Sequence, residues 1–531
     1  MDYSQSPVVL RSLRIRPSVL SVRGAFVPAG RLTARRAGRA LADLPRRHLG
    51  LVLLLAAGLA LRVAMMVAYR PALWFQGDSG GYIRRSQQWP ELEPRWPFPW
   101  LIKAFEWTGT LASVAAVQHL AGLALGVAAY LLLRRLGVGP WLAALAAAPL
   151  LLDATQLTLE HYLLTETLFT AAVAVAALLL VRRERPGPAT CLGAGVAVAL
   201  GMATRPTGIV AVAPLLVFLA LPWRGWPPPV AYLLGIVAFF GAVFVGTGTV
   251  RDALGLEGGK FLYGRTAQIA DCDRLELRPG LRKLCPTQPL DQRPERPDWF
   301  IWTRDSPIRN AERPADLDEF AREVIRQQPG DYLAKVASDT ARYFWPTRLG
   351  PAEACLASLW RPRLAPTNWA ADYDCTPRTA GADYRWQPTP SRDVEPNAAS
   401  RIMQAYGRYA VTPPPVLAAA TLIALLGAAW PRRGGLRLSM IALLYAAIGA
   451  GIMVFSVATS MFDLRYGLPA LAFLPIAAAV GWQRLRSAWT DRPPPVDSGS
   501  ERLAPTAESN GKHDEATGDR GHGVVAVPQR G

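Results

Sequence analysis

Charged residues are scarce in this sequence. Of 531 residues, 18% are Asp, Glu, Lys or Arg, whereas 51% are hydrophobic. A chain so poor in charge is too apolar for an ordinary soluble protein, whose surface carries more charged side chains. The hydrophobic residues also occur in blocks separated by polar stretches, which does not suit a single globule. Both features indicate a membrane protein.

Cysteine is scarce as well, and the sequence contains no CxxC motif. Of the five cysteines, Cys191 starts a hydrophobic block and the others lie between Val250 and Thr412, where such blocks are missing. An even set in one polar segment predicts two disulfides in an oxidising compartment, and local pairs are our expectation among Cys272, Cys285, Cys355 and Cys375. The pairing stays open, because four cysteines allow several connectivities. Free thiols are the alternative, and a zinc site is less favoured because no histidines cluster with the cysteines.

The hydrophobic blocks are long enough to cross a membrane. The first, Leu49 to Val67, approaches the roughly 20 residues that a hydrocarbon core requires of a helix. Similar blocks bring the total to about ten candidate spans, namely 111–133, 141–152, 163–181, 192–203, 209–221, 230–245, 416–429, 438–457 and 468–482. Three are short, so each is either a tilted span or a helix that enters the membrane and returns. The predicted fold is an all-α polytopic membrane protein with about ten transmembrane helices and a mixed extracytoplasmic domain.

Basic residues are in excess, with a formal net charge of +18. Their positions indicate membrane topology and not nucleic-acid binding, because they flank the predicted spans. Arginines crowd residues 1–47, and alternation of the spans then places the later basic loops on the same side, namely Arg134–Arg135, Arg182–Arg185, Arg224, Arg432–Arg437 and Arg484–Arg486. The positive-inside rule therefore predicts a multi-pass plasma-membrane protein with both termini in the cytoplasm.

Shifts in composition divide the chain into successive parts. The basic leader resembles a transit peptide, but it lacks an apolar core before Leu49, so we expect a cytosolic tail. Within the polar segment, the sequence from Asp316 predicts two helices broken at Pro329-Gly330, whose apolar stripes face either a domain core or the membrane. The predicted parts are a disordered cytoplasmic tail (1–47), a membrane domain with outer catalytic loops (48–249), an extracytoplasmic domain with disulfides (250–412), C-terminal transmembrane helices (413–483) and a disordered cytoplasmic tail (484–531).

One carboxylate follows the first span directly on the predicted outer side. Asp78 stands between glycines in the sequence GDSGGYI, with Tyr82 four residues later. Glycines let a ligand approach the backbone, and a carboxylate at this depth is suited to accept a proton from a hydroxyl. Taken alone, Asp78 is better explained as a solvated loop residue.

Ionisable residues also occur at three other outer junctions. Glu160, His161 and Glu166 open the fourth span, Arg205 ends the fifth in ATRPTG, and Asp463, Arg465 and Tyr466 end the ninth in FDLRYGLP. Charges at membrane depth are costly unless they are paired or line a hydrated cavity, so one shared site is the economical explanation. Arginines there suit a lipid phosphate, which they bind with paired hydrogen bonds. The alternative for either arginine alone is snorkelling to the interface.

Several short motifs resemble a known family in their order along the chain. They are GDSGGYI, Gln118 in VAAVQHLAGL, LLTETLF, ATRPTG and RYGLP. The chain resembles, from about Leu49 to Trp482, the GT-C superfamily of integral membrane glycosyltransferases, especially the bacterial phospholipid-carrier-dependent type related to protein mannosyltransferases and lipid A aminoarabinose transferases. The resemblance implies that Asp78 is the catalytic carboxylate and that the other site residues bind substrate, namely Tyr82, Glu160, His161, Glu166, Arg205, Arg465 and Tyr466.

The resemblance further implies a polyprenyl-phosphate sugar as donor and an extracytoplasmic glycan, lipid or protein as acceptor. Many members carry Asp-Glu in the first loop, whereas Ser79 follows Asp78 here, so a second acid or metal ligand is missing. No cofactor and no metal ligand is expected, although the sequence does not exclude a divalent cation. A transporter or flippase is the first alternative, but its charges would reach both sides of the membrane. A non-enzymatic scaffold is the second, and it leaves the outer charges unexplained.

Overall fold

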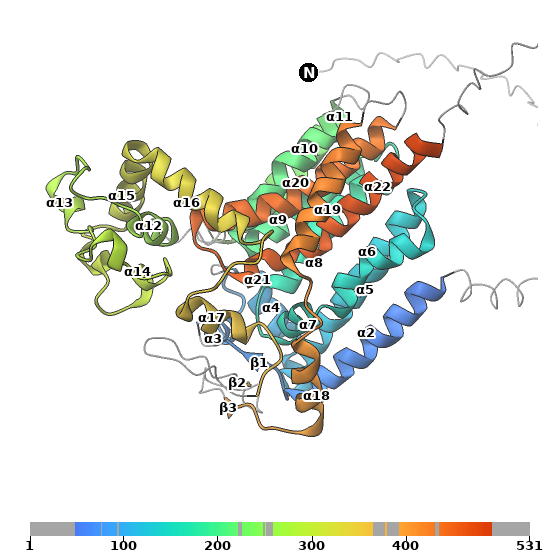
Figure 1. Cartoon of the computed structure of the whole chain (residues 1–531), viewed down its shortest axis with the longest axis horizontal. Helices are drawn as coiled ribbons and strands as arrows, with labels where there is room; N and C mark the ends of the chain where they lie inside the picture. Colours follow the sequence, from blue (N-terminus) through green and yellow to red (C-terminus); the bar gives the residue numbers. More distant parts are fainter. Residues whose placement is uncertain are drawn as a thin grey trace, which may run out of the picture.

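The structure is a computed structural model that describes residues 48–75, 77–92, 95–220, 226–247, 250, 259–364, 378–379, 392–430 and 435–490. Within these residues the chain is mostly helical. Long helices lie side by side in one body, and a smaller lobe of short helices projects from one end of it (Figure 1). The predicted terminal tails, 1–47 and most of 484–531, lie outside the described residues.

Four helices in the described part of the chain are long and apolar enough to cross a membrane: α2 (Leu49–Ala68), α5 (Ala112–Arg135), α11 (Pro227–Thr247) and α20 (Leu436–Thr459). The number rises to six if each of two bent pairs is one span. These pairs are α6 (Pro140–Leu152) with α7 (Ala154–His161), bent by 46°, and α21 (Leu464–Gly467) and η6 (Leu468–Ala472) with α22 (Leu474–Thr490), bent by 41°. The predicted helical membrane protein is confirmed at this level, and the count of ten spans stays a prediction.

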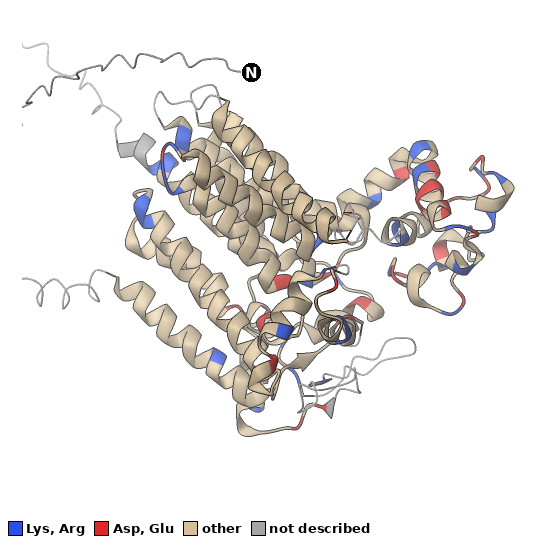
Figure 2. Cartoon of the chain, turned by 180° about the vertical axis from the view of Figure 1, so that it is seen from behind, with Lys and Arg blue, Asp and Glu red and all other residues tan. Residues whose placement is uncertain are grey.

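Shorter apolar helices complete the body. They are α8 (Glu166–Val181), α9 (Pro188–Thr204), η2 (Pro206–Ala211) with α10 (Val212–Ala220), and α19 (Pro414–Ala429). Large parts of α5, α6, α8, α9, α20 and α22 pack into one core made almost wholly of Ala, Leu, Val and Ile side chains. Charges are sparse along these helices, and several basic residues lie at helix ends (Figure 2). The orientation in the membrane that was read from the arginines stays a prediction.

An aspartate caps one helix in each bent pair: α7, the second half of the first pair, and α21, the start of the second pair. Asp153 accepts hydrogen bonds from the backbone of Thr155 (2.8 Å) and Gln156 (3.2 Å) at the start of α7. Asp463 accepts one from the backbone of Arg465 (3.0 Å) at the start of α21. An N-cap carboxylate satisfies the exposed amides of a helix start, so these aspartates fix where each new helix begins. The bends thereby bring polar helix termini into the body.

The loop that follows α2 pairs with a distant part of the chain. Strand β1 (Leu73–Trp74) lies antiparallel to β2 (Arg378–Thr379), with Leu73 opposite Thr379, and β2 lies antiparallel to β3 (Arg392–Asp393). The elements around this sheet are α3 (Ser79–Gln87), α4 (Pro97–Ala104), η1 (Glu106–Thr108), α17 (Pro351–Leu359) and α18 (Ala398–Gly407). Trp360 and Met403 are buried in the same core as Tyr82 and Leu73. The end of the predicted extracytoplasmic domain therefore packs directly on the membrane domain.

The projecting lobe has a core of its own. It contains α12 (Lys260–Ala267), α13 (Pro279–Arg282), η4 (Leu290–Gln292), α14 (Trp299–Trp302), η5 (Pro307–Asn310) and α15 (Pro314–Gln327). Tyr263, Phe300, Phe320 and Val324 are fully buried there. The apolar stripe of α15 thus faces a domain core and not the membrane.

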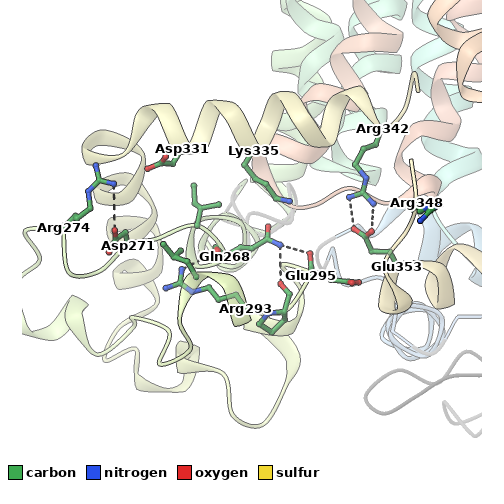
Figure 3. Close-up of a pocket in the computed structure, with 14 residues that line it drawn as sticks. Gln268, Asp271, Arg274, Arg293, Glu295, Asp331, Lys335, Arg342, Arg348 and Glu353 are labelled. Carbon is green, nitrogen blue, oxygen red and sulfur yellow. Dashed lines mark hydrogen bonds and ion pairs between the residues drawn. The ribbon is translucent and has the colours of Figure 1, made fainter. Parts of the chain in front are cut away.

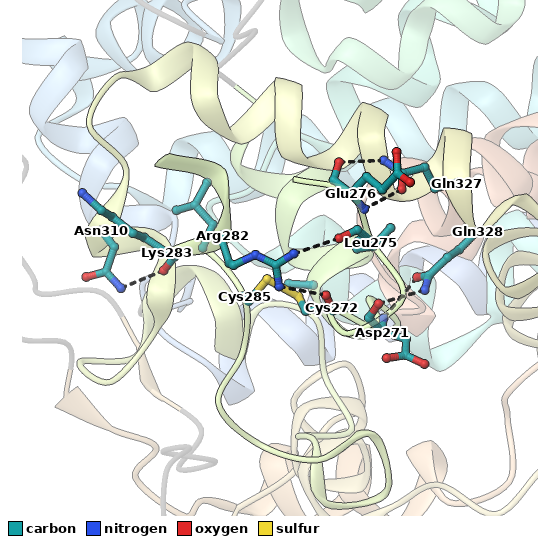
Figure 4. Close-up of a disulfide and its surroundings, with 12 residues drawn as sticks. Asp271, Cys272, Leu275, Glu276, Arg282, Lys283, Cys285, Asn310, Gln327 and Gln328 are labelled. Atoms are coloured by element: carbon teal, nitrogen blue, oxygen red, sulfur yellow. Dashed lines mark hydrogen bonds between the residues drawn. A yellow bond between two sulfur atoms is a disulfide. The ribbon is translucent and has the colours of Figure 1, made fainter. Parts of the chain in front are cut away.

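A disulfide joins Cys272 to Cys285 within this lobe (Figure 4). Arg282 lies beside it and donates hydrogen bonds to the carbonyls of Cys272 (3.3 Å) and Leu275 (3.0 Å). The local pair predicted for these cysteines is confirmed. Cys355 is also disulfide-bonded, and Cys375 lies outside the described residues.

Helix α16 (Pro329–Ala341) connects the lobe to the helical body. The predicted break is confirmed, since α15 ends at Gln327 and α16 starts at Pro329. Its stripe is only partly buried, because Val336 is 9% exposed and Leu333 is 62% exposed. At the body, Tyr332 donates to the carbonyl of Ala458 (2.9 Å). The buried ion pair between Arg265 and Asp339 (2.7 Å) ties the lobe to the same helix.

Candidate active site

Asp78 lies in a tight turn between β1 and α3. The Ser79 hydroxyl accepts a hydrogen bond from the backbone of Phe75 (2.9 Å) and donates one to the carbonyl of Leu163 (3.1 Å). The turn is therefore fixed to the start of the fourth predicted span. Asp78 occupies the N-cap position of α3 without accepting a capping hydrogen bond from any described residue. Its carboxylate is thus held near a helix N-terminus and stays available for other partners.

Two arginines face the Asp78 carboxylate. Arg465 Nη1 lies 2.9 Å from Oδ2, and Arg95 Nη1 lies 3.6 Å from Oδ1. Arg95 Nη1 also donates to the hydroxyl of Tyr82 (3.2 Å). Burial raises the pKa of Asp78, but the charges of Arg465 and Arg95 outweigh it, so the pKa lies below the usual value. Asp78 is therefore ionised in this arrangement, and its side chain is 24% exposed.

Aromatic rings hold the guanidinium of Arg465. Its central carbon lies 4.9 Å from the ring of Phe75, 5.2 Å from that of Trp360 and 5.0 Å from that of Tyr466. Trp360 also donates a hydrogen bond to Oδ1 of Asp463 (2.8 Å). Stacking on rings suits the flat guanidinium group and leaves its edge free to bind oxygens. The orientation of Arg465 therefore depends on Phe75 and Trp360, which are distant in the sequence, as well as on its neighbour Tyr466.

Glu166 and Arg205 extend this cluster. Glu166 lies in the first turn of α8 and forms an ion pair with Arg205, which follows the last residue of α9. Arg205 also donates to the hydroxyl of Thr165 (3.4 Å) and lies 5.1 Å from the centre of the Tyr466 ring. Arg465 Nε is 3.7 Å from Oε1 of Glu166. The two arginines therefore share Glu166 and Tyr466.

Several buried polar atoms in this cluster have no hydrogen-bond partner within the described part of the chain. They are Glu166 Oε2, Asp463 Oδ2 and Arg465 Nε. Buried polar atoms are almost always satisfied in folded proteins, so unsatisfied ones gathered at one place indicate a missing water or ligand. We name the group the outer charge cluster; its members are Asp78, Tyr82, Arg95, Glu166, Arg205, Asp463, Arg465 and Tyr466. The structure therefore brings together six of the predicted site residues.

Glu160 and His161 lie in a different network. Glu160 forms a two-pronged ion pair with Arg62, at 2.9 and 2.8 Å, and its Oε2 also contacts Nδ1 of His119 at 2.9 Å. His119 Nε2 contacts Nδ1 of His161 (3.0 Å), whose Nε2 meets the carbonyl of Tyr69 (2.8 Å). Glu160 and His161 are fully buried. We call this group the inner charge network, and its predicted role in substrate binding stays a prediction.

Sequence reasoning overlooked important members of both groups. Arg62 interrupts the first hydrophobic block, and a charge within such a block signals a buried partner. Arg95 and Trp360 reach the outer charge cluster from loops with no recognisable motif. Among the described residues, no group of three or more His, Cys, Asp and Glu side chains is placed to hold a metal ion. The expectation that no divalent cation is required stays a prediction.

Comparison with known proteins supports the predicted resemblance. Residues 97–245 match the family model described as dolichyl-phosphate-mannose-protein mannosyltransferase. The match runs from α4 to α11 and includes Glu166 and Arg205, whereas Asp78 and Arg465 lie outside it. No curated protein and no solved structure matches the chain. The resemblance to GT-C glycosyltransferases is thus confirmed by the family model.

Proposed function

We propose that this chain, a membrane glycosyltransferase of the GT-C type, moves one sugar from a polyprenyl-phosphate donor to a hydroxyl of an extracytoplasmic glycan, lipid or protein. One observation carries the proposal: the ion pair between Asp78 and Arg465 inside a cluster that also holds Arg205. A carboxylate that can take a proton lies beside two guanidinium groups that can bind a phosphate. Sugar transfer from a lipid phosphate needs both a base that takes the acceptor proton and cations that bind the phosphate.

The two arginines supply the donor site. Arg465 and Arg205 both lie against the ring of Tyr466, at 5.0 and 5.1 Å. The donor phosphate would replace the Asp78 carboxylate on Nη1 of Arg465 and reach its unsatisfied Nε. Paired hydrogen bonds of this kind are stronger than neutral ones and fix the orientation of the phosphate. Donor binding therefore requires the pair between Asp78 and Arg465 to open.

Opening that pair prepares Asp78 for catalysis. In the donor-free protein the charge of Arg465 helps hold the pKa of Asp78 below its usual value, against the opposing effect of burial. When the phosphate binds the guanidinium of Arg465, Asp78 loses this partner. The Asp78 carboxylate stays partly buried, so the pKa of Asp78 rises. A carboxylate of higher pKa is the stronger base. The proposal thus predicts that the donor binds first.

The transfer itself is a single displacement. The acceptor oxygen attacks the anomeric carbon and its proton moves to Asp78, while the bond from that carbon to the phosphate oxygen breaks. The electron pair of the broken bond stays on the phosphate, and Arg205 and Arg465 stabilise the added negative charge. A phosphate leaving group needs no general acid, in contrast to glycoside hydrolysis with its two carboxylates. Attack from the face opposite the phosphate inverts the anomeric centre.

Sugar transfer by the purified full chain tests the donor class. Labelled sugar would be offered on polyprenyl phosphate, on polyprenyl diphosphate and on a nucleoside diphosphate, with a membrane extract as the source of acceptor. We expect product from the polyprenyl phosphate alone, with inverted anomeric configuration by NMR. Equal transfer from the nucleoside diphosphate, or retention of configuration, would contradict the proposal.

A further inference from the structure

A polar cavity lies beneath α16, and its lining includes no residue of the outer charge cluster (Figure 3). Its volume is about 580 Å³, which falls within the range of about 300–1,000 Å³ that is usual for small-molecule sites. Residues of three segments line it, and those used below are Arg293, Glu295, Asp331, Lys335, Arg348 and Glu353. The cavity lies outside the part of the chain that matches the family model.

The floor of this cavity is fixed by hydrogen bonds. Arg293 donates to the carbonyls of Gln288 (3.2 Å) and Ala267 (2.9 Å), and the Gln268 amide donates to the carbonyl of Glu295 (2.6 Å). Helix α16 forms the opposite wall and presents Asp331 and Lys335 on one face, one helical turn apart (Figure 3). The cavity is therefore built from ordered elements of the lobe and the connecting helix.

Charges of both signs line this cavity. Lys335 bonds to Asp339 (3.3 Å), and Arg342 bonds to Glu353 (2.8 Å). Within the described part of the chain, Glu295, Asp331 and Arg348 form no ion pair. A ligand can therefore reach Asp331 and Arg348 without first breaking an ion pair, whereas Glu295 already accepts a hydrogen bond from the backbone of Ala352. Apolar side chains reach the lining from Ile269, Leu290 and Pro294, and the other side chains that line the cavity are charged or polar.

This lining selects among ligand classes. The lining carries four carboxylates and five basic side chains, so it is nearly balanced in charge and matches neither a polyanion nor a polycation. An apolar ligand would leave these charges without hydrogen bonds. A sugar hydroxyl both donates and accepts, so neighbouring hydroxyls can bind a carboxylate and a guanidinium together. A peptide needs apolar pockets for its side chains, which are scarce here. The chemistry therefore favours a hydroxyl-rich glycan over a peptide.

One wall of the cavity lies close to the outer charge cluster. Arg342, which lines the cavity, stacks on Phe462 at 4.1 Å. The next residue, Tyr343, packs on the same ring at 4.8 Å and donates to the carbonyl of Asp463 (2.9 Å). Asp463 in turn accepts from the backbone of Arg465. A ligand in the cavity is thus separated from the candidate donor site by a short series of packed side chains.

We propose that the cavity beneath α16 binds a segment of the acceptor glycan remote from the reacting hydroxyl, through Glu295, Asp331, Lys335 and Arg348. This inference rests on the proposed function, because it assigns the acceptor to the glycan class. Binding energy from remote units holds the reacting end of the acceptor near Asp78. Longer glycans therefore bind better than single sugars.

Oligosaccharide binding by the full chain in lipid nanodiscs tests this site. The probes are mannotetraose, arabinotetraose, the corresponding methyl monosaccharides and a serine- and threonine-containing decapeptide. The test variant combines Asp331→Asn with Arg348→Ala. The matched control combines Asp305→Asn with Arg309→Ala, two exposed residues of the lobe that do not line the cavity. Both double variants change charge equally, and neither removes an ion pair in the described residues.

We expect wild type and control to bind at least one tetrasaccharide and the test variant to bind it about tenfold more weakly, as loss of hydrogen bonds to charged groups predicts. Methyl monosaccharides should bind weakly and equally to all three proteins. No tetrasaccharide binding by the wild type, equal binding by both double variants, or selective binding of the decapeptide would overturn the assignment. Sugar transfer from polyprenyl phosphate to acceptor in a membrane extract is measured in parallel. If the wild type transfers no sugar but still binds glycan in the cavity, the proposed function fails and the assignment of the cavity as a glycan site stands.

Discussion

Two groups of charged residues lie within the helical body, and they differ in how far their hydrogen bonds are satisfied. In the inner charge network, Arg62 uses every nitrogen of its guanidinium, on Glu160 and on backbone carbonyls of Gly58, Leu150 and Leu151. In the outer charge cluster, Glu166 Oε2, Asp463 Oδ2 and Arg465 Nε have no hydrogen-bond partner among the described residues. Glu160 is 0% exposed, whereas Asp78 is 24% exposed.

This difference separates a structural role from a chemical one. Leu150 and Leu151 end α6, where the bend before Asp153 releases carbonyls from helical hydrogen bonds. Arg62 donates hydrogen bonds to these carbonyls and also binds Glu160 of α7. The inner charge network therefore holds the bent pair α6 and α7 against α2. The outer charge cluster keeps exposed and unsatisfied groups that a ligand can complete. Hydrogen bonding and exposure therefore distinguish the inner charge network from the outer charge cluster, and depth in the membrane alone does not.

Removing Arg62 should give the largest effect on stability. Arg62→Ala removes the guanidinium from the buried Glu160 and leaves it with only His119 and Gln156 as partners. Breaking a buried ion pair in this way costs about 3–5 kcal/mol. We expect loss of most folded protein, measured as the yield of monodisperse protein and its free energy of unfolding in mixed micelles. Arg84→Ala on an exposed face of α3 is the control and should unfold like the wild type. Equal stability of the two variants would contradict a structural role for the inner charge network.

Changing Arg465 should lower activity far more than stability. In Arg465→Lys the charge remains, but the flat group that stacks on Phe75 and Trp360 and binds a phosphate in two places is lost. We expect kcat/KM for the donor to fall about 100-fold, the usual effect of losing one preorganised donor in a charge-stabilising site. The apparent Tm should barely change. A matched Arg309→Lys variant in the lobe should keep full activity, and an unaltered kcat/KM in Arg465→Lys would exclude Arg465 from the donor site.

A methyl group placed between α5 and α7 should disturb only the inner charge network. A Cβ atom at Gly122 would lie 1.8 Å from Oε1 of Glu160, whereas one at Gly81, near Asp78, would have nothing within 4 Å. Overpacking costs about 1–3 kcal/mol, so Gly122→Ala should lower the free energy of unfolding by that amount. Gly81→Ala should match or exceed wild-type stability, because alanine favours helices by up to about 1 kcal/mol. Equal unfolding curves for the two variants would contradict the packing described here.

Acid should weaken the pair between Asp78 and Arg465 only at low pH. The folded pKa of Asp78 is lowered, so its contribution to stability is complete above the unfolded value of about 3.9 and is lost as the pH falls through the folded value. The difference in unfolding free energy between wild type and Asp78→Asn should therefore be constant from about pH 5 to pH 8 and shrink below about pH 4. A difference that shrinks near neutral pH would show that the Asp78 pKa is raised and not lowered.

The sequence allowed the general fold and much of the outer charge cluster to be predicted. Long apolar blocks and flanking arginines carry strong local signals. Asp78, Arg205 and Arg465 were each ambiguous alone and were predicted to share a site because all of them lie at the ends of such blocks. The separation of Glu160 and His161 from Asp78 was not predictable, because it depends on the bend between α6 and α7 and on the distant partner Arg62. Trp360 and Arg95 reach the cluster through tertiary packing, which leaves no periodic pattern in the sequence.

The rate of sugar transfer by the Asp78→Asn protein tests the central claim most directly. Asparagine has nearly the same shape as aspartate but cannot accept the acceptor proton, and a positioned base contributes about 10²–10⁴-fold to the rate. With saturating donor and acceptor, we predict a fall in kcat of that size, an unchanged anomeric product and a folded protein with near wild-type Tm. A kcat within about twofold of the wild type would contradict the assignment of Asp78 as the catalytic base.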